Sequence, residues 1–143
     1  MLVYDADNQI LGRFCSIVAK QLMKGESVVV VNAEKAVVSG KPSTTKEHYL
    51  KKVARGDPFK GPFFPRTPDG ILRRTVRGML PWYKTRGREA YKRLRVFIGV
   101  PEKFSKLEPQ KMQRPEASDA KKLKTKSMSL SELSLSIGAK KRW

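Results

Sequence analysis

The sequence predicts an α/β protein with a parallel or mixed sheet flanked by helices. Three observations predict this class: a short apolar strand at residues 2–4, an amphipathic segment at residues 10–24, and four consecutive valines at residues 28–31. A strand, a helix and a covered strand in this order form a βαβ unit. With 143 residues, the chain is long enough for one domain with a hydrophobic core.

The segment at residues 10–24 has the periodicity of an α-helix. Its apolar side chains share one broad arc and its polar side chains share the opposite arc. The apolar arc holds Ile10, Leu11, Phe14, Cys15, Ile17, Val18, Ala19 and Leu22, and the polar arc holds Arg13, Ser16, Lys20 and Lys24. Gly25 is suited to end this helix.

Two strands and a short helix are predicted next. Residues 27–33 contain the valines without polar alternation, which indicates a strand covered on both faces. Residues 36–39 repeat the strand pattern briefly. Thr44 and Glu47 have the spacing of a capping box, which predicts a helix from residue 44 to about residue 53.

A long loop is expected at residues 56–70, where glycines and prolines are frequent. Phe59, Phe63 and Phe64 lie in this loop. Stacking of these rings on unpaired nucleic-acid bases is one interpretation. The interpretation that we favour is that the three rings anchor the loop on the domain.

The next helix is expected to begin at Thr67 and Pro68 and to run to about residue 80. One half of its circumference holds Ile71, Leu72, Thr75, Val76, Met79 and Leu80, and the other half holds Arg73, Arg74, Arg77 and Gly78. One face should therefore pack on the sheet while the other presents three guanidinium groups. Residues 96–99 return to a strand pattern.

Residues 101–143 are expected to form a basic extension to a core domain of residues 1–100. The polar, lysine-rich part up to about residue 126 should cross the surface without much structure and be loosely attached in the free protein. Ser129 and Glu132 have capping-box spacing and predict a short helix that docks through Leu130, Leu133 and Ile137.

The positive charge is large and unevenly distributed. Thirty-one Lys and Arg against thirteen Asp and Glu give a net charge of +18, of which residues 41–100 carry +12 and residues 1–40 carry none. Such an excess favours a polyanionic partner, and arginine pairs bidentately with phosphate oxygens. The residues themselves nominate these nucleic-acid contacts: Lys20, Lys24, Arg66, Arg73, Arg74, Arg77, Lys84, Arg86, Arg88, Lys92, Arg93, Arg95, Lys140, Lys141 and Arg142.

Catalytic, cofactor and metal sites are not indicated. Cys15, the only cysteine, lies on the apolar arc, and His48, the only histidine, lies among surface-type residues. The Ser39-Gly40-Lys41 sequence after a valine-rich strand lacks the spacing of a phosphate-binding loop. The longest aliphatic run is far shorter than the ~20 residues that span a bilayer. We therefore expect a cytoplasmic protein with no enzymatic activity, membrane partner or small-molecule substrate.

Several motifs are similar to those of a known family. Val76-Arg77-Gly78-Met79-Leu80-Pro81, Gly87-Arg88 and Leu94-Arg95-Val96-Phe97-Ile98-Gly99 resemble the signature of the large-subunit ribosomal protein L13 family. Leu11-Gly12-Arg13, residues 29–35 and residues 39–41 occur in the family's order. The resemblance covers about residues 2–100, and the short Gly25-Glu26 turn and the tail resemble archaeal or eukaryotic members, the short total length favouring archaeal ones.

The resemblance implies a three-layer α/β/α fold with a four-stranded, mainly parallel sheet. It also implies a structural constituent of the large ribosomal subunit that binds large-subunit rRNA, supports early subunit assembly and adjoins other ribosomal proteins. The contact residues that it implies are Arg13, Lys35, Lys41, Arg77, Lys84, Arg88 and Arg95. An extra-ribosomal RNA-binding regulator of translation and a nucleotide-dependent α/β enzyme remain as alternatives.

Overall fold

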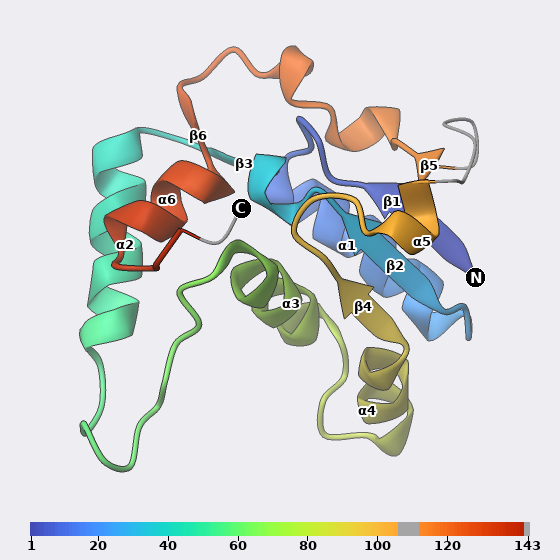
Figure 1. The fold of residues 1–143 in the computed structure, drawn as a ribbon. Coiled ribbons are helices and arrows are strands. Elements are labelled where there is room, and N and C mark those ends of the chain that lie inside the picture. Colours follow the sequence, from blue (N-terminus) through green and yellow to red (C-terminus); the bar gives the residue numbers. More distant parts are fainter. Residues whose placement is uncertain (106–111, 142–143) are drawn as a thin grey trace.

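The computed structural model describes residues 1–105 and 112–141, and its central feature is a parallel sheet of strand order β4-β2-β1-β5 (Figure 1). The strands β1 (Leu2–Asp5), β2 (Val28–Val31) and β4 (Leu94–Val96) form its main part. The strand β5 (Met112–Gln113) adds a two-residue edge beside β1. The helix α1 (Leu11–Met23) connects β1 to the parallel β2, so the predicted βαβ unit is confirmed.

The strand β2 is buried on both faces, as its unbroken run of valines predicts. Val28 and Val30 belong to the main core beneath the helices. Val29 and Val31 face the other side of the sheet, in a smaller apolar cluster with Val3. Burial of one such side chain stabilises the fold by about 1.5–3 kcal/mol. The four valines of β2 therefore stabilise the packing on both sides of the sheet.

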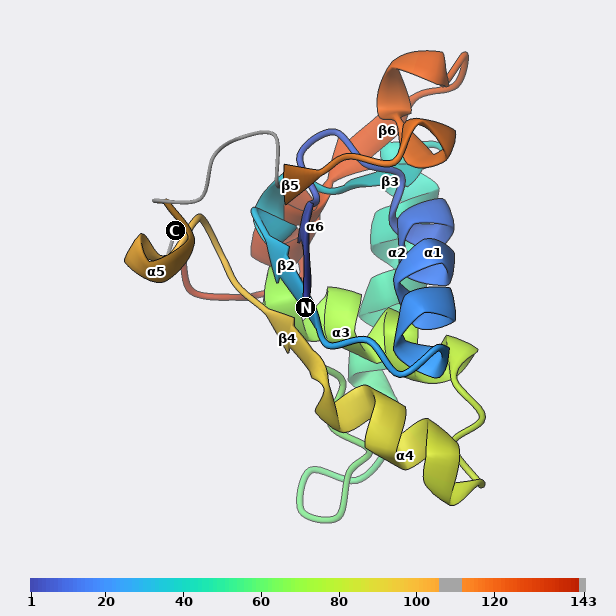
Figure 2. The ribbon, with the colours of Figure 1, turned by 90° about the vertical axis from the view of Figure 1, so that its right-hand side faces the viewer.

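The helices are concentrated on one face of the sheet. Figure 2 shows α1, α2 (Pro42–Ala54) and α3 (Pro68–Met79) on one side and the short α5 (Glu102–Ser105) on the other. Phe97 and Phe104 cover that other side, with ring centroids 5.9 Å apart. The expected third layer is therefore reduced to one four-residue helix and its preceding loop.

The strand expected at residues 36–39 forms outside the main sheet. This strand, β3 (Val37–Ser39), pairs antiparallel with β6 (Ser127–Ser129) in a separate two-stranded sheet. The 3-10 turn Ala33–Lys35 follows β2 directly and starts at Asn32, whose φ of 54° is left-handed. This turn directs the chain away from the sheet, so β3 is not one of the parallel strands.

The apolar arc predicted for α1 forms the centre of the core. Phe14, Cys15, Val18 and Leu22 are fully buried, and the ring of Phe14 meets the Tyr4 ring edge-on at 6.2 Å. The arginine and lysines of the opposite arc are exposed. The period of this helix therefore predicted its buried face correctly.

One helix begins earlier than predicted, and another helix was not predicted. The helix α2 begins at Pro42, two residues before the predicted start, because proline suits the first position of a helix. Glu47 does not cap it and instead pairs with Lys51 at 2.7 Å. The helix α4 (Thr85–Lys92) was not predicted, because only Gly87 and Ala90 of its residues are buried.

The described part of the C-terminal segment makes backbone hydrogen bonds to the domain at several points, which corrects the expectation that it crosses the surface without much structure. The Ile10 amide donates to the Ser118 carbonyl at 2.6 Å, and the Ala120 amide donates to the Asn8 carbonyl at 2.7 Å. The Gly40 amide donates to the Lys126 carbonyl at 2.8 Å. Residues 106–111 of the same segment lie outside the described residues.

The predicted terminal helix is confirmed as α6 (Leu130–Ser136). Its capping box is complete: the Glu132 amide donates to the Ser129 hydroxyl oxygen at 3.2 Å, and the Ser129 amide donates to the Glu132 carboxylate at 3.3 Å. The side chains predicted to dock it, those of Leu130, Leu133 and Ile137, are buried. Gly138, with φ of 89°, follows its end.

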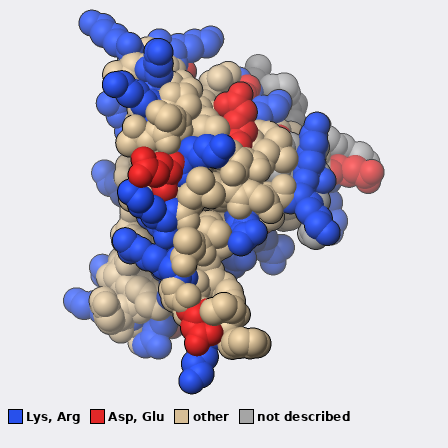
Figure 3. Space-filling model, turned by 90° about the vertical axis from the view of Figure 1, so that its left-hand side faces the viewer, with Lys and Arg blue, Asp and Glu red and all other residues tan. Residues whose placement is uncertain are grey.

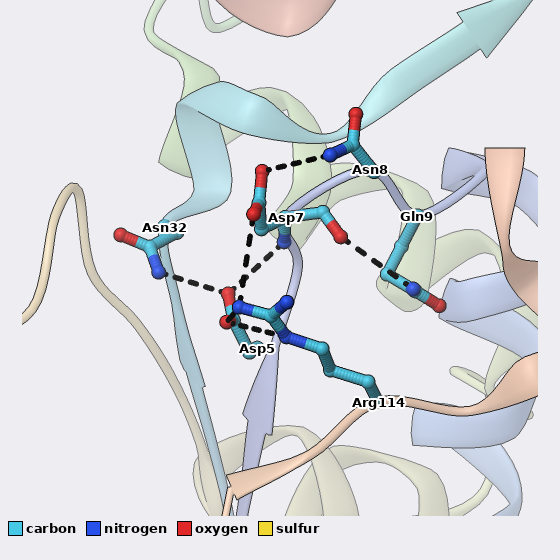
Figure 4. A network of polar contacts seen from close by, with 6 residues as sticks. All are labelled: Asp5, Asp7, Asn8, Gln9, Asn32 and Arg114. Atoms are coloured by element: carbon cyan, nitrogen blue, oxygen red, sulfur yellow. Dashed lines mark hydrogen bonds and ion pairs between the residues drawn. The ribbon is translucent and has the colours of Figure 1, made fainter. Parts of the chain in front are cut away.

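A buried carboxylate ties the C-terminal segment to β1 (Figure 4). The side chain of Asp5 is 4% exposed and accepts hydrogen bonds from Asn32 at 2.8 Å and from the Asp7 amide at 3.0 Å. Arg114, next to β5, donates from Nε to Asp5 at 2.9 Å and lies 3.6 Å from Asp7. Burial alone would raise the pKa of Asp5, but these donors outweigh burial, and the net effect is a lowered pKa.

Replacing Arg114 by methionine should lower the free energy of unfolding at neutral pH by about 1–3 kcal/mol, because the buried Asp5 carboxylate loses the hydrogen bonds that Arg114 donates. The lowered pKa makes the contribution of Asp5 to stability fully present above its unfolded value of about 3.9. That contribution is lost as the pH falls through the folded pKa. Urea unfolding at several pH values should therefore show a smaller acid-induced loss of stability in Arg114→Met than in the wild type.

The matched control is Lys121→Met, which removes one exposed cation from the same segment. Its free energy of unfolding should equal that of the wild type at every pH. Equal stability of both variants at neutral pH would contradict a stabilising role for the Asp5 and Arg114 pair.

Candidate nucleic-acid interface

The helix α3 separates apolar and cationic side chains on its two faces. Ile71, Leu72 and Val76 are buried against the core, whereas Arg73 and Arg74 are exposed. Arg77 is half-buried. Met79, which was assigned to the packed face, is 42% exposed, because it is the last residue of the helix and its side chain extends beyond the core.

The cationic face of α3 forms one wall of a large open groove. The groove has a volume of about 1310 Å³, and the start of α1, the strand β3, the C-terminal half of α2 with Arg55, residues 62–65 and Tyr91 of α4 form the rest of its lining. Six cationic side chains line it: Arg13, Lys52, Arg55, Arg73, Arg74 and Arg77. Among the described residues that line this basic groove, none is Asp or Glu. The basic groove therefore attracts anions and repels other cations.

Aromatic rings support two of the α3 arginines. The Arg77 guanidinium lies 4.0 Å from the centre of the Trp82 ring, and the Arg73 guanidinium lies 5.1 Å from the Tyr91 ring. The two rings meet edge-on at 5.4 Å. Stacking uses the flat face of a guanidinium and leaves its N–H edge available, so these arginines are positioned while their donors can bind phosphate.

Two glycines in the lining have no internal structural reason to be glycine. Gly12 in α1 and Gly78 in α3 line the basic groove, and a Cβ at either would meet no atom within 4 Å. Gly87 in α4 differs, because a Cβ there would lie 2.6 Å from the Pro81 carbonyl carbon. Glycine inside a helix costs about 1 kcal/mol relative to alanine. Gly12 and Gly78 therefore leave helix backbone open to a partner.

We expect alanine at Gly78 and alanine at Gly87 to change the stability in opposite directions. Gly78→Ala should raise the free energy of unfolding by about 0.5–1 kcal/mol, since alanine favours the helix and meets open space. The matched variant Gly87→Ala should lower it by about 1–3 kcal/mol through overpacking against Pro81. Chemical denaturation of both variants measures these changes. A destabilised Gly78→Ala would show that Gly78 has an internal role.

Comparison with known proteins decides the family. A model of the family described as Ribosomal protein L13 matches residues 1–103. The chain belongs to the ribosomal protein L13 family. Every residue that lines the basic groove lies within the matched part of this L13 protein.

The relatives of this L13 protein include archaeal proteins named large ribosomal subunit protein uL13. That of Methanopyrus kandleri is 61% identical over 99 residues, which cover 69% of this chain and 62% of the relative, less than two thirds of its length. That of Archaeoglobus fulgidus is 51% identical over 95% of this chain and 86% of the relative. That of Methanocaldococcus jannaschii is 43% identical over 98% of this chain and 99% of the relative. This L13 protein is therefore of the archaeal type.

The structure brings only some of the predicted cations of this L13 protein together. Arg13, Arg73, Arg74 and Arg77 converge on the basic groove from α1 and α3. The other predicted contacts that are exposed lie outside its lining: Lys20, Lys24, Lys35, Lys41, Arg66, Lys84, Arg86, Arg88, Lys92, Arg95, Lys140 and Lys141. Figure 3 shows Lys and Arg spread over the face that carries α2, with Asp and Glu in separate patches. Arg142 lies outside the described residues.

Arg93 has an internal contact instead of a free guanidinium. It is half-buried, and its Nη2 donates to the Leu22 carbonyl at 2.9 Å. This bond joins the end of α1 to the residue before β4. One N–H group of Arg93 is thus committed to the fold, and Arg93 stays a predicted contact only through its other N–H groups.

Lys52 and Arg55 line the groove and were not among the predicted contacts, and Phe63, which was expected to pack on the domain, lines it too. Lys52 lies 4.9 Å from the ring of the buried Tyr49, on the inner side of α2. The helical position of Lys52, three residues after Tyr49, was the available signal. Phe63 is 74% exposed, and only Phe64 anchors the loop, through its contact with the Tyr49 ring at 5.9 Å. The interpretation that all three phenylalanines pack was therefore wrong.

The remaining reactive groups have ordinary structural positions. Burial raises the pKa of the Cys15 thiol to about 12, which keeps it protonated, and His48 is exposed as predicted. Within residues 1–105 and 112–141, no three His, Cys, Asp or Glu side chains gather to form a metal site. The helices in this part of the chain are too short or too polar to cross a membrane.

Proposed function

We propose that this L13 protein is a structural constituent of the large ribosomal subunit and binds large-subunit rRNA through the basic groove. The observation that carries the proposal is the convergence of six cationic side chains on one groove whose described lining contains no carboxylate. Five of the six are arginines, whose planar forks match phosphate oxygens. The relatives named large ribosomal subunit proteins support the assignment.

The groove links RNA binding to the folded state. Arg13 comes from α1, Arg55 follows the end of α2, and Arg74 comes from α3, so an RNA segment in the groove contacts three elements at once. These side chains are adjacent only in the folded protein. A ligand that binds only the folded state stabilises it, which is consistent with an assembly factor that joins rRNA early.

The cations outside the groove are proposed as further phosphate contacts. Arg86, Arg88 and Lys92 are exposed on α4, and Lys84 precedes this helix. We propose that these cations extend the phosphate-binding surface from the groove onto α4. Neighbouring ribosomal proteins are proposed partners of the faces that rRNA leaves uncovered.

The experiment that tests this function is sedimentation of ribosomes from cells that carry a tagged chain. After a high-salt wash, the protein should remain in large subunits at one copy per particle. Recovery only in free ribonucleoprotein would support an RNA-binding regulator of translation instead. Ligand-dependent turnover by the purified, folded protein would support an enzyme.

A further inference from the structure

The loop before α3 presents two aromatic rings to solvent. Phe59 is 92% exposed and Phe63 is 74% exposed, although phenylalanine is normally buried in a folded domain. Phe63 lines the basic groove. Phe64, between Phe63 and α3, is half-buried against Tyr49 and lies 5.7 Å from the Lys52 ammonium. The loop is thus anchored by one ring and leaves two others free.

The loop is held in one conformation by its own hydrogen bonds. The Gly61 amide donates to the Asp57 carbonyl at 2.9 Å, and the Asp57 amide donates to the Gly61 carbonyl at 3.2 Å. The Asp57 carboxylate accepts from the Phe59 amide at 2.8 Å. A Cβ at Gly56 would lie 2.6 Å from the Gly61 carbonyl carbon, so the hairpin closes tightly. The backbone that carries Phe59 is therefore preorganised at the tip of the hairpin.

The charges around the rings favour nucleic acid over an apolar protein surface. Lys52, Arg55, Lys60 and Arg66 lie on or beside this loop, against one carboxylate, that of the exposed Asp57, which accepts from the Phe59 amide. An apolar protein pocket that covered Phe63 would also bury the neighbouring cations without partners, which is costly. An RNA strand places bases and phosphates side by side and satisfies both kinds of group.

We propose that unpaired RNA bases stack on Phe63 and Phe59 while the phosphates of the same strand bind Arg55 and Lys52. This inference rests on the proposed function and adds that the groove selects unpaired nucleotides over continuous duplex. In a duplex the bases are already stacked on each other, and their flat faces are closed to a phenyl ring. Single-stranded loops and bulges leave these faces free.

The test compares Phe63→Leu with Phe63→Trp in titrations of large-subunit rRNA at several salt concentrations. Leucine keeps an apolar side chain but removes the flat face, so the affinity should fall by about 5-fold or more, up to roughly 150-fold for complete loss of one stacked base. Tryptophan should keep or increase the affinity. The salt dependence should not change in either variant, because stacking carries no charge.

Two further measurements complete the experiment. Single-stranded oligoadenylate should quench the fluorescence of Phe63→Trp more than that of the wild type, whereas an RNA duplex with the same number of phosphates should not. Leu135→Ala, which removes an exposed apolar side chain from α6, is the control and should leave rRNA affinity unchanged. Thermal unfolding should show that all variants fold.

The outcomes separate this inference from the proposed function. If the wild type does not bind rRNA in a salt-dependent way, the proposed function fails. If the wild type binds with a steep salt dependence but Phe63→Leu binds equally well, only the stacking inference is wrong. Equal rRNA binding by Phe63→Leu together with its loss from assembled subunits would assign the ring to an apolar pocket of a neighbouring protein.

Discussion

Replacing Arg73, Arg74 and Arg77 together by glutamine is expected to weaken binding to large-subunit rRNA by roughly 100-fold at physiological salt. Each lost phosphate contact removes about 0.7 (single strand) to 0.9 (duplex) from the slope of log affinity against log salt, so three lost contacts should reduce the slope by about 2–3. The effect follows from the position of all three side chains in the lining of the basic groove. Titrations of an rRNA fragment at several salt concentrations measure both quantities.

The triple variant should still fold. The contacts of Arg73 with Tyr91 and of Arg77 with Trp82 are partly exposed and contribute about 0.5–1 kcal/mol each. The control variant replaces Lys46, Lys51 and Lys124, which are exposed and outside the groove lining, by glutamine. The control variant removes the same number of positive charges and should weaken rRNA binding much less. If the folded arginine variant keeps wild-type affinity and slope, this face is only solvated, and the RNA is held by the loop and the cations of residues 84–95.

Local periodicity predicted the elements whose structure follows from the spacing of their own residues. The eight apolar positions of residues 10–24 are buried or half-buried, and β2 is buried on both faces. The α6 capping box formed because Ser129 and Glu132 satisfy each other within one helical turn. In these cases the interactions that determine the structure lie within a few residues, so sequence reasoning had access to them.

Other elements depend on partners that are distant in sequence. The strand β3 pairs with β6, about ninety residues further along the chain, and nothing in residues 36–39 indicates that partner. The helix α4 lacks an apolar stripe because it packs through Gly87 against the Pro81 backbone. A close contact of this kind needs a small side chain, which gives no hydrophobic periodicity.

The basic groove could be predicted only in part. The three arginines of α3 share a face because of helical spacing, and sequence reasoning found them. Lys52 and Arg55 join them only because α2 and α3 both pack against α6, whereas Arg93 donates one of its N–H groups to the Leu22 carbonyl. Charge counts find cations, but tertiary packing decides which of them are free to bind RNA.

The packed face of α3 gives the second large expected effect. Leu72→Ala should lower the free energy of unfolding by about 2–5 kcal/mol, since Leu72 is fully buried and alanine would leave a cavity. Its neighbours in the core include Phe14 and Cys15 of α1, and the Cys15 thiol lies 3.9 Å from the Leu72 carbonyl. The loss should therefore weaken the contact between α1 and α3, the two helices that bring Arg13 near Arg73.

Met79→Ala is the matched variant on the same helix. Met79 is 42% exposed, so its truncation should cost about 1 kcal/mol or less. Urea unfolding of both variants measures the difference, and rRNA titration under conditions where both are folded should give near wild-type affinity, because neither side chain lines the groove. Equal destabilisation by the two variants would mean that the end of α3 packs as tightly as its centre. In that case the packed face would extend to the last turn, as the helical projection of the sequence predicted.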